Sequence, residues 1–141
     1  VLLMKEVLSK LDATVLKEEK GDEYTVLEFS LNDTQYDRIT MKVYPNKIVL
    51  ETPVVYIENP NSSKKLFEKH KGNFEEIKEG KEYRYGKTLP RDTHQLKGYI
   101  KKIVKMSCIV GLNYELRYYN EYKADKAVEL LKKYNYPIEF G

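Results

Sequence analysis

The amino-acid sequence predicts a single α+β domain that spans residues 1–141. The chain has 141 residues, of which 41% are hydrophobic and 33% are charged, and this is the size and composition of one folded domain with its own core. After an N-terminal helix, segments with strand periodicity come first and further helical segments follow, which favours α+β over a parallel α/β sheet. We expect an N-terminal helix packed on an antiparallel β-meander of about three strands, followed by two or three further helices and one or two extra strands.

The first helix is predicted to begin near Leu3 and to end at about Glu19. Apolar residues recur in this stretch at steps of three and four, which is the spacing of one helix face. Gly21 and Asp22 follow and end the pattern. We expect the apolar face to cover one side of the sheet. Its members are Leu3, Met4, Val7, Leu8, Leu11 and Val15.

Three strands are predicted next, at residues 24–31, 39–43 and 48–57. In the first two, apolar and polar residues alternate, as they do on half-buried strands. Residues 44–47 form a predicted tight turn, because Pro45 presets φ at the second turn position. Pro53 cannot donate to a ladder hydrogen bond, so we expect it at a sheet edge or a bulge. The short connections predict antiparallel pairing.

The middle of the chain is less regular. A short helix is predicted from Ser62 or Ser63 to Lys71, where Gly72 is the stop signal. Residues 73–91 allow two interpretations, a hairpin closed by residues 78–81 or a loop with one strand.

The strongest helix prediction covers residues 92–111. Asp92 is the predicted N-cap, and Gln95 three residues later completes a variant capping box. Gly111 is the predicted C′ residue, because glycine enters the left-handed conformation at low cost. The apolar face comprises Leu96, Tyr99, Ile100, Ile103, Val104, Ser107 and Cys108. Beyond it we expect a strand at 114–119, a helix at 124–134 and an extended tail at 137–140.

Positive charge is concentrated in one region of the chain. The formal net charge is +3 overall, yet residues 78–105 hold nine basic and three acidic residues, a net charge of +6. Lys97, Lys101 and Lys105 follow one another at steps of four, on the side of the predicted helix opposite its apolar face. Lys102 lies beside them.

The single cysteine, Cys108, excludes an intramolecular disulfide. Its place on the apolar helix face predicts a buried, unreactive thiol. Together with the lack of a recognisable signal peptide, it predicts a reducing, cytoplasmic location. The opening Val-Leu-Leu-Met is too short for a membrane span, so no membrane association is expected. Abundant Lys and Glu are typical of thermophile proteins, whereas the eight Asn residues argue against that origin.

The common catalytic and cofactor motifs are absent from the sequence: there is no GxGxxG, phosphate-binding GxxxxGK[ST], HExxH or GxSxG. We predict no cofactor and no metal site, since the two His and one Cys are far apart. Arg91, Asp92 and His94 are the remaining catalytic candidates, as anion holder, orienting carboxylate and general base. In the alternative interpretation Asp92 caps the helix and His94 lies exposed in its first turn.

The basic region is the basis of a nucleic-acid-binding hypothesis. Cations along one face bind phosphates, and interleaved aromatic rings, here Tyr83 and Tyr85, stack on bases. The alternative is that the helix carries lysines only to keep its outer face soluble. The candidate phosphate-binding residues are Arg84, Lys87, Arg91, Lys97, Lys101 and Lys105.

Tyr118, Tyr119 and Tyr122 are candidates for a protein interface, because tyrosine supplies rigid area and a hydroxyl. An ordinary tyrosine-rich strand end is the alternative. The favoured hypothesis is a small non-enzymatic binding module that acts through a protein partner or by self-association as a homodimer. The alternatives are nucleic-acid binding through residues 78–105, and an enzyme that uses Arg91, Asp92 and His94 on an anionic substrate.

Overall fold

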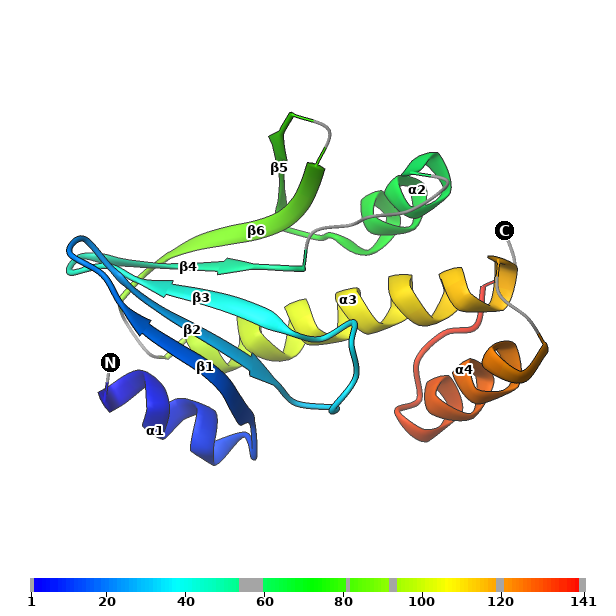
Figure 1. Cartoon of the computed structure of the whole chain (residues 1–141), viewed down its shortest axis with the longest axis horizontal. Coiled ribbons are helices and arrows are strands. Elements are labelled where there is room, and N and C mark those ends of the chain that lie inside the picture. Colours follow the sequence, from blue (N-terminus) through cyan, green and yellow to red (C-terminus); the bar gives the residue numbers. More distant parts are fainter. Residues whose placement is uncertain (1, 54–59, 81, 92–93, 119–120, 140–141) are drawn as a thin grey trace.

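One six-stranded antiparallel sheet and four helices make up the computed structural model of the chain, within the residues that it describes (Figure 1). The structure describes residues 2–53, 60–80, 82–91, 94–118 and 121–139. The predicted α+β fold is confirmed, since an N-terminal helix precedes the strands and further helices follow them.

The helices and strands alternate in blocks along the chain. The helices are α1 (Leu2–Lys10), α2 (Pro60–His70), α3 (Leu96–Tyr118) and α4 (Glu121–Lys133). The strands are β1 (Thr14–Lys20), β2 (Thr25–Ser30), β3 (Ile39–Val43), β4 (Lys47–Glu51), β5 (Glu75–Glu79) and β6 (Glu82–Pro90). Their order in the sheet is β1-β2-β3-β4-β6-β5, and all neighbours pair antiparallel.

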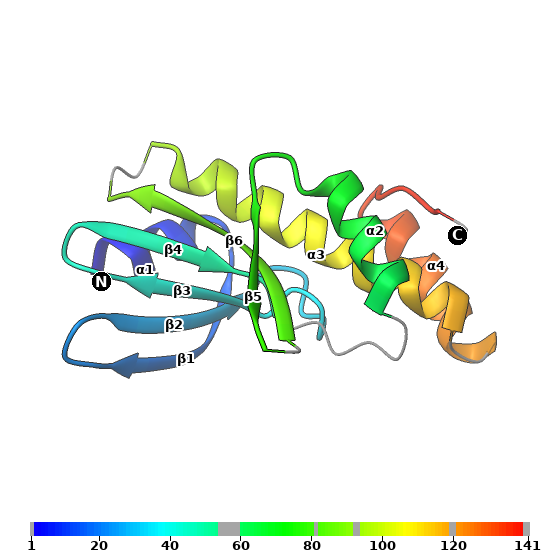
Figure 2. The same ribbon diagram turned by 90° about the horizontal axis from the view of Figure 1, so that it is seen from above.

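The core lies between one face of the sheet and helices α1 and α3, which Figure 1 shows on the same side of the strands. In Figure 2 the opposite face of β1 to β4 is nearer the viewer, and no helix lies in front of it. Each fully buried large apolar side chain contributes about 1.5–3 kcal/mol relative to exposure. The inward-facing residues include Leu27, Phe29, Ile39, Met41, Ile48 and Leu50 from the strands and Met4, Leu8, Ile100 and Ile103 from the helices.

The first helix prediction was too long, because α1 ends at Lys10 and residues 14–20 form β1. The chain turns at Asp12, which has a φ of 55°. It then pairs with β2 from Thr14 onwards, and ladder hydrogen bonds to β2 replace the helical ones. Val15 continues the helical spacing in the sequence, yet 42% of its surface is exposed. The helical spacing of apolar residues could not show that residues 14–20 pair with the edge of β2.

Gly111 does not end the long helix, and residues 114–118 of the strand predicted at 114–119 are helical, while Tyr119 lies outside the described residues. α3 continues through Gly111 to Tyr118. The ring of Tyr36 lies against Gly111, and an added Cβ atom would collide with it. The glycine therefore provides room for a loop residue and does not adopt the left-handed conformation of a C′ residue. Asn113 and Tyr114 are buried, so the apparent alternation in this stretch reflects a helix buried on several sides.

The uncertain stretch at 73–91 contains a hairpin. Its residue pairs run from Glu75↔Gly86 at the open end to Glu79↔Glu82 beside the turn. Gly80 lies in its turn with a φ of 63°. The third strand was predicted at residues 48–57, whereas β4 ends at Glu51. Residues 54–57, predicted to continue it, lie outside the described residues. Thr52 N–H still donates to Tyr85 C=O at 2.8 Å, so pairing with β6 extends one residue past β4.

Candidate functional site

The four lysines of α3 form an exposed basic surface, here called the lysine face and defined as Lys97, Lys101, Lys102 and Lys105. Between residues 93 and 114 the sequence contains no acidic residue. Within the part of the chain that the structure describes, none of the four lysines forms a salt bridge. Within the described segments, the positive charge of the lysine face is therefore not paired with a carboxylate in a salt bridge.

The spacing of these lysines suits an extended polyanion. Residues four apart on an α-helix are separated by about 6 Å along the axis. Lys97, Lys101 and Lys105 therefore form a row about 12 Å long. The step of about 6 Å between neighbouring lysines is close to the distance between alternate phosphates on one strand, about 7 Å at roughly 3.4 Å per nucleotide along B-DNA. The predicted exposure of this row is confirmed.

The predicted stacking role of Tyr83 and Tyr85 was wrong, because both rings are buried, with 8% and 0% exposed surface. Tyr85 stacks on Phe67 of α2, with ring centroids 4.7 Å apart. Its hydroxyl donates to Glu68 at 2.9 Å, and burial together with this carboxylate raises the pKa of Tyr85. Tyr85 thus holds β6 against α2, Tyr83 meets Tyr85 edge-on with ring centroids 6.4 Å apart, and burial closes both rings to a ligand.

Arg84 lies on the opposite face of β6, because side chains alternate along a strand. Its Nη1 atom donates to Oε2 of Glu51 at 3.0 Å. Lys42 contacts the other carboxylate oxygen of Glu51 at 3.2 Å. Arg84 is therefore paired with a buried carboxylate on the opposite side of the sheet, and it does not join the lysine face as predicted.

Lys87 faces the helix side of the sheet instead. Its ammonium group lies 5.9 Å from the ring centroid of Tyr99 on α3. The ammonium of Lys102 lies 5.2 Å from the same centroid, so both cations are within the range of a cation–π contact. Tyr99 is half-buried, and it brings together cations from β6 and α3.

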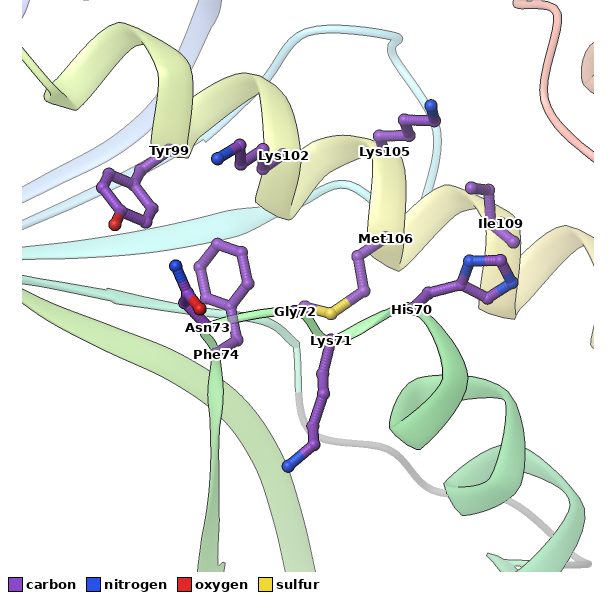
Figure 3. Close-up of a pocket in the computed structure, with 10 residues that line it drawn as sticks. All are labelled: His70, Lys71, Gly72, Asn73, Phe74, Tyr99, Lys102, Lys105, Met106 and Ile109. Atoms are coloured by element: carbon purple, nitrogen blue, oxygen red, sulfur yellow. The ribbon is translucent and has the colours of Figure 1, made fainter.

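A pocket of about 290 Å³ opens beside Tyr99, between α3 and the chain that links α2 to β5 (Figure 3). Phe74, Tyr99 and Met106 provide its apolar lining, and Phe74 meets Tyr99 edge-on with centroids 6.0 Å apart. In Figure 3 the Lys102 side chain extends toward Tyr99. The polar lining residues are His70, Lys71, Asn73, Lys102 and Lys105.

The C-terminal tail brings one carboxylate, that of Glu139, against His70, which lines this pocket. Buried Asn113 accepts a hydrogen bond from Glu139 N–H at 2.6 Å and donates to Pro137 C=O at 3.0 Å. Glu139 then contacts His70 Nε2 at 3.0 Å and Lys69 Nζ at 3.1 Å. Burial opposes ionisation of Glu139, but these two partners outweigh it and lower its pKa. The carboxylate neutralises cations at this end of the pocket only.

The predicted catalytic group is not assembled in the described residues. Arg91 is exposed and donates from Nη1 to Pro45 C=O at 3.2 Å. His94 is exposed before α3, and Asp92 lies outside the described residues. Among the described residues, no group of three His, Cys, Asp or Glu side chains could hold a metal ion.

Cys108 is fully buried, as predicted. Asn32 Nδ2 and Thr34 Oγ1 lie 3.7 Å from its sulfur. Burial, with a smaller contribution from Asp37, raises the pKa of the thiol to about 12. The thiolate is scarce at neutral pH, which makes Cys108 a structural residue.

Two of the three interface candidates lie in helices that the structure describes. Tyr118 is the last residue of α3 and Tyr122 lies in the first turn of α4. Tyr119 lies outside the described residues. None of the helices in the described segments combines the length and apolar character that spanning a membrane requires.

Sequence reasoning missed the pocket, although Tyr99 was placed in the apolar pattern of α3. The signal available was a tyrosine two residues from lysines on both sides, at Lys97 and Lys101.

No protein-family model matches the chain, and comparison with curated proteins and with solved structures gives no match.

Proposed function

We propose that the protein is a non-enzymatic binding module whose lysine face binds the phosphate backbone of nucleic acid. The observation that carries this proposal is the row of exposed lysines on α3 without a salt-bridge partner among the described residues. Most of the free energy of such binding comes from releasing the counterions condensed on the phosphates. Uncompensated cations on one rigid helix favour this release.

Lysine in place of arginine indicates the kind of recognition. A lysine ammonium is a point charge on a flexible stem, whereas arginine matches phosphate or guanine in two parallel hydrogen bonds. Arg84, which stands between Tyr83 and Tyr85 in the sequence, is bound to Glu51. Backbone binding with little dependence on base sequence is therefore the expected mode.

The test is a fluorescence anisotropy titration of labelled oligonucleotides at about 50 and 200 mM salt, where backbone binding differs strongly. The variant K97E/K101E/K105E should weaken binding about tenfold or more at the lower salt and flatten the salt dependence. The matched control is K10E/K20E/K132E, which makes the same change in net charge at exposed positions of α1, β1 and α4. Equal binding by the two variants, or no binding at low salt, would exclude the proposal.

A second candidate is a protein interface, including self-association, at the free edge of the sheet. β1 is an edge strand whose seven residues are all exposed. Leu3, Val15 and Leu16 keep 50%, 42% and 41% of their surface exposed. An edge strand with apolar side chains is a template for pairing with another strand.

Sedimentation velocity over a concentration series measures this second candidate. The native chain should form a dimer at high micromolar concentration, and Leu16→Glu should return it to monomer. Lys20→Glu, at the exposed end of the same strand, serves as control for a change of charge. A native chain that is monomeric throughout, with no partner, excludes the interface.

A further inference from the structure

We infer that the pocket beside Tyr99 holds one unstacked nucleotide of a single strand whose phosphates lie along the lysine face. This inference rests on the proposed function and specifies its ligand as single-stranded nucleic acid. It follows from three properties of the pocket: its lining, its continuity with the lysine face, and its size.

The lining matches the two chemical parts of a nucleotide. Half-buried Tyr99 offers its ring to the flat face of a base, and Phe74 and Met106, which are 4% and 2% exposed, form the apolar wall behind that ring. Lys102 and Lys105 lie on the α3 side of the same pocket, where they would meet a phosphate. Aromatic rings beside cations are the combination with which proteins bind single strands, because every base has a face that stacks.

The pocket is continuous with the lysine face through Lys105. This residue ends the row that begins at Lys97 and also lines the pocket. Lys102, one helical turn before Met106, reaches toward the ring of Tyr99. A strand that follows the row would therefore arrive at the pocket without crossing an acidic residue of α3, as none occurs before Glu115.

The volume of about 290 Å³ is at the lower end of the range of about 300–1,000 Å³ for ligand sites. It is large enough for one base. In a duplex each base is stacked and paired, and extruding one costs a few kcal/mol. A single strand avoids that cost, so the pocket should favour single strands over duplexes.

The experiment uses a single-stranded oligonucleotide that contains 2-aminopurine, whose fluorescence is quenched when the base stacks. The chain has no Trp, so excitation above the tyrosine absorption band reports on the probe alone. Binding to the native protein should quench the probe in single strands and leave a duplex carrying the same probe unchanged. Native protein should also bind the single strand more tightly than the duplex.

Two variants test the pocket itself. Tyr99→Leu removes the ring but keeps an apolar side chain, and it should weaken single-strand binding roughly tenfold, within the range of base stacking. Asn73→Leu fills the mouth from an exposed position without changing the charge. It tests the pocket independently should Tyr99→Leu fail to fold. Tyr44→Leu is the matched control, because Tyr44 is also half-buried and has a lysine, Lys47, 4.7 Å from its ring centroid.

The outcomes separate this inference from the proposed function. Salt-sensitive binding that is equal for single strands and duplexes, unquenched, and unchanged in both pocket variants would overturn the pocket and leave the lysine face standing. Absence of binding at low salt would overturn both. Loss of quenching in Tyr99→Leu and Asn73→Leu, with Tyr44→Leu behaving as native, is the result expected.

Discussion

Two groups of cations in this protein have opposite surroundings. On the sheet face that no helix covers in Figure 2, Lys42 and Arg84 both contact Glu51, whose side chain is only 7% exposed. On α3, Lys97, Lys101 and Lys105 are exposed, and among the described residues they have no salt-bridge partner. The first group stabilises the fold, and the second remains available to a ligand.

The difference shows why counting charge along a sequence misassigns residues. Arg84 and Lys97 belong to the same basic stretch, yet their elements direct them to different environments. Tyr83 and Tyr85 enter the core, so Arg84 between them must emerge on the opposite face of β6. There it donates to Glu51 at the end of β4, the strand next to β6 in the sheet, and its charge is paired within the protein.

The largest expected effect comes from breaking the paired group. Glu51→Ala leaves Lys42 and Arg84 facing each other without a carboxylate, and removing one member of a buried ion pair costs about 3 kcal/mol or somewhat less here, since both cations are partly exposed. Urea unfolding followed by circular dichroism measures the loss. Nucleic-acid binding at a temperature where the variant is folded should not change.

The matched variant is Glu19→Ala, which removes the partner of Lys17 at 3.0 Å. Both side chains of that pair are more than half exposed, and surface pairs contribute about 0–1 kcal/mol. A loss at Glu19 as large as that at Glu51 would contradict the distinction between the two kinds of pair.

A smaller loss of stability is expected from a change at the buried Tyr85, which, unlike Tyr99, should not contribute to oligonucleotide binding. Tyr85→Phe removes the hydroxyl that donates to Glu68 and keeps the ring stacked on Phe67, so it should cost about 1 kcal/mol of stability. It should leave oligonucleotide binding unchanged, because the ring is fully buried. Weaker binding in Tyr85→Phe with native stability would restore the stacking role that the burial of this residue excludes.

The fold was predictable where local pattern and tertiary contacts agree. β2 and β3 lie where alternation placed them, and the beginning of α3 follows the apolar spacing from Leu96. Prediction failed where a distant contact decides the structure. β1 forms because β2 offers an edge, and α3 continues past Gly111 because Tyr36 packs there.

The site was predictable only in part for the same reason. The exposure of the lysine row follows from helix geometry, so the sequence was sufficient. The pocket unites residues 70–74 with α3, and Asn113 brings Glu139 beside His70 across the C-terminal tail. No local pattern encodes contacts of that range.

The smallest effect concerns Glu139, which pairs with cations at one end of the pocket, whereas Lys102 and Lys105 have no salt-bridge partner in the described part of the chain. Glu139→Gln releases the charge of Lys69, and of His70 when it is protonated, toward a bound strand. We expect oligonucleotide affinity to rise about two- to threefold at low salt and less at higher salt, because screening weakens partly exposed charges. Glu129→Gln, at an exposed position of α4, is the control for net charge.

The pH dependence of stability in Glu139→Gln shows whether the ionised carboxylate is responsible for the effect. The pKa of Glu139 is lowered in the folded chain from its usual 4.5, so the carboxylate stabilises the fold above that pH, and the contribution is lost as pH falls through the lowered value. The unfolding free energies of native protein and Glu139→Gln should therefore differ at neutral pH and converge in acid. Convergence together with unchanged affinity would mean that the tail pairs Lys69 and His70 for stability alone, and that a bound strand ends at Lys105. A rise in affinity that disappears in Glu139→Gln combined with Lys69→Gln would assign the released charge to Lys69 and extend the nucleic-acid path past the pocket to the end of α2.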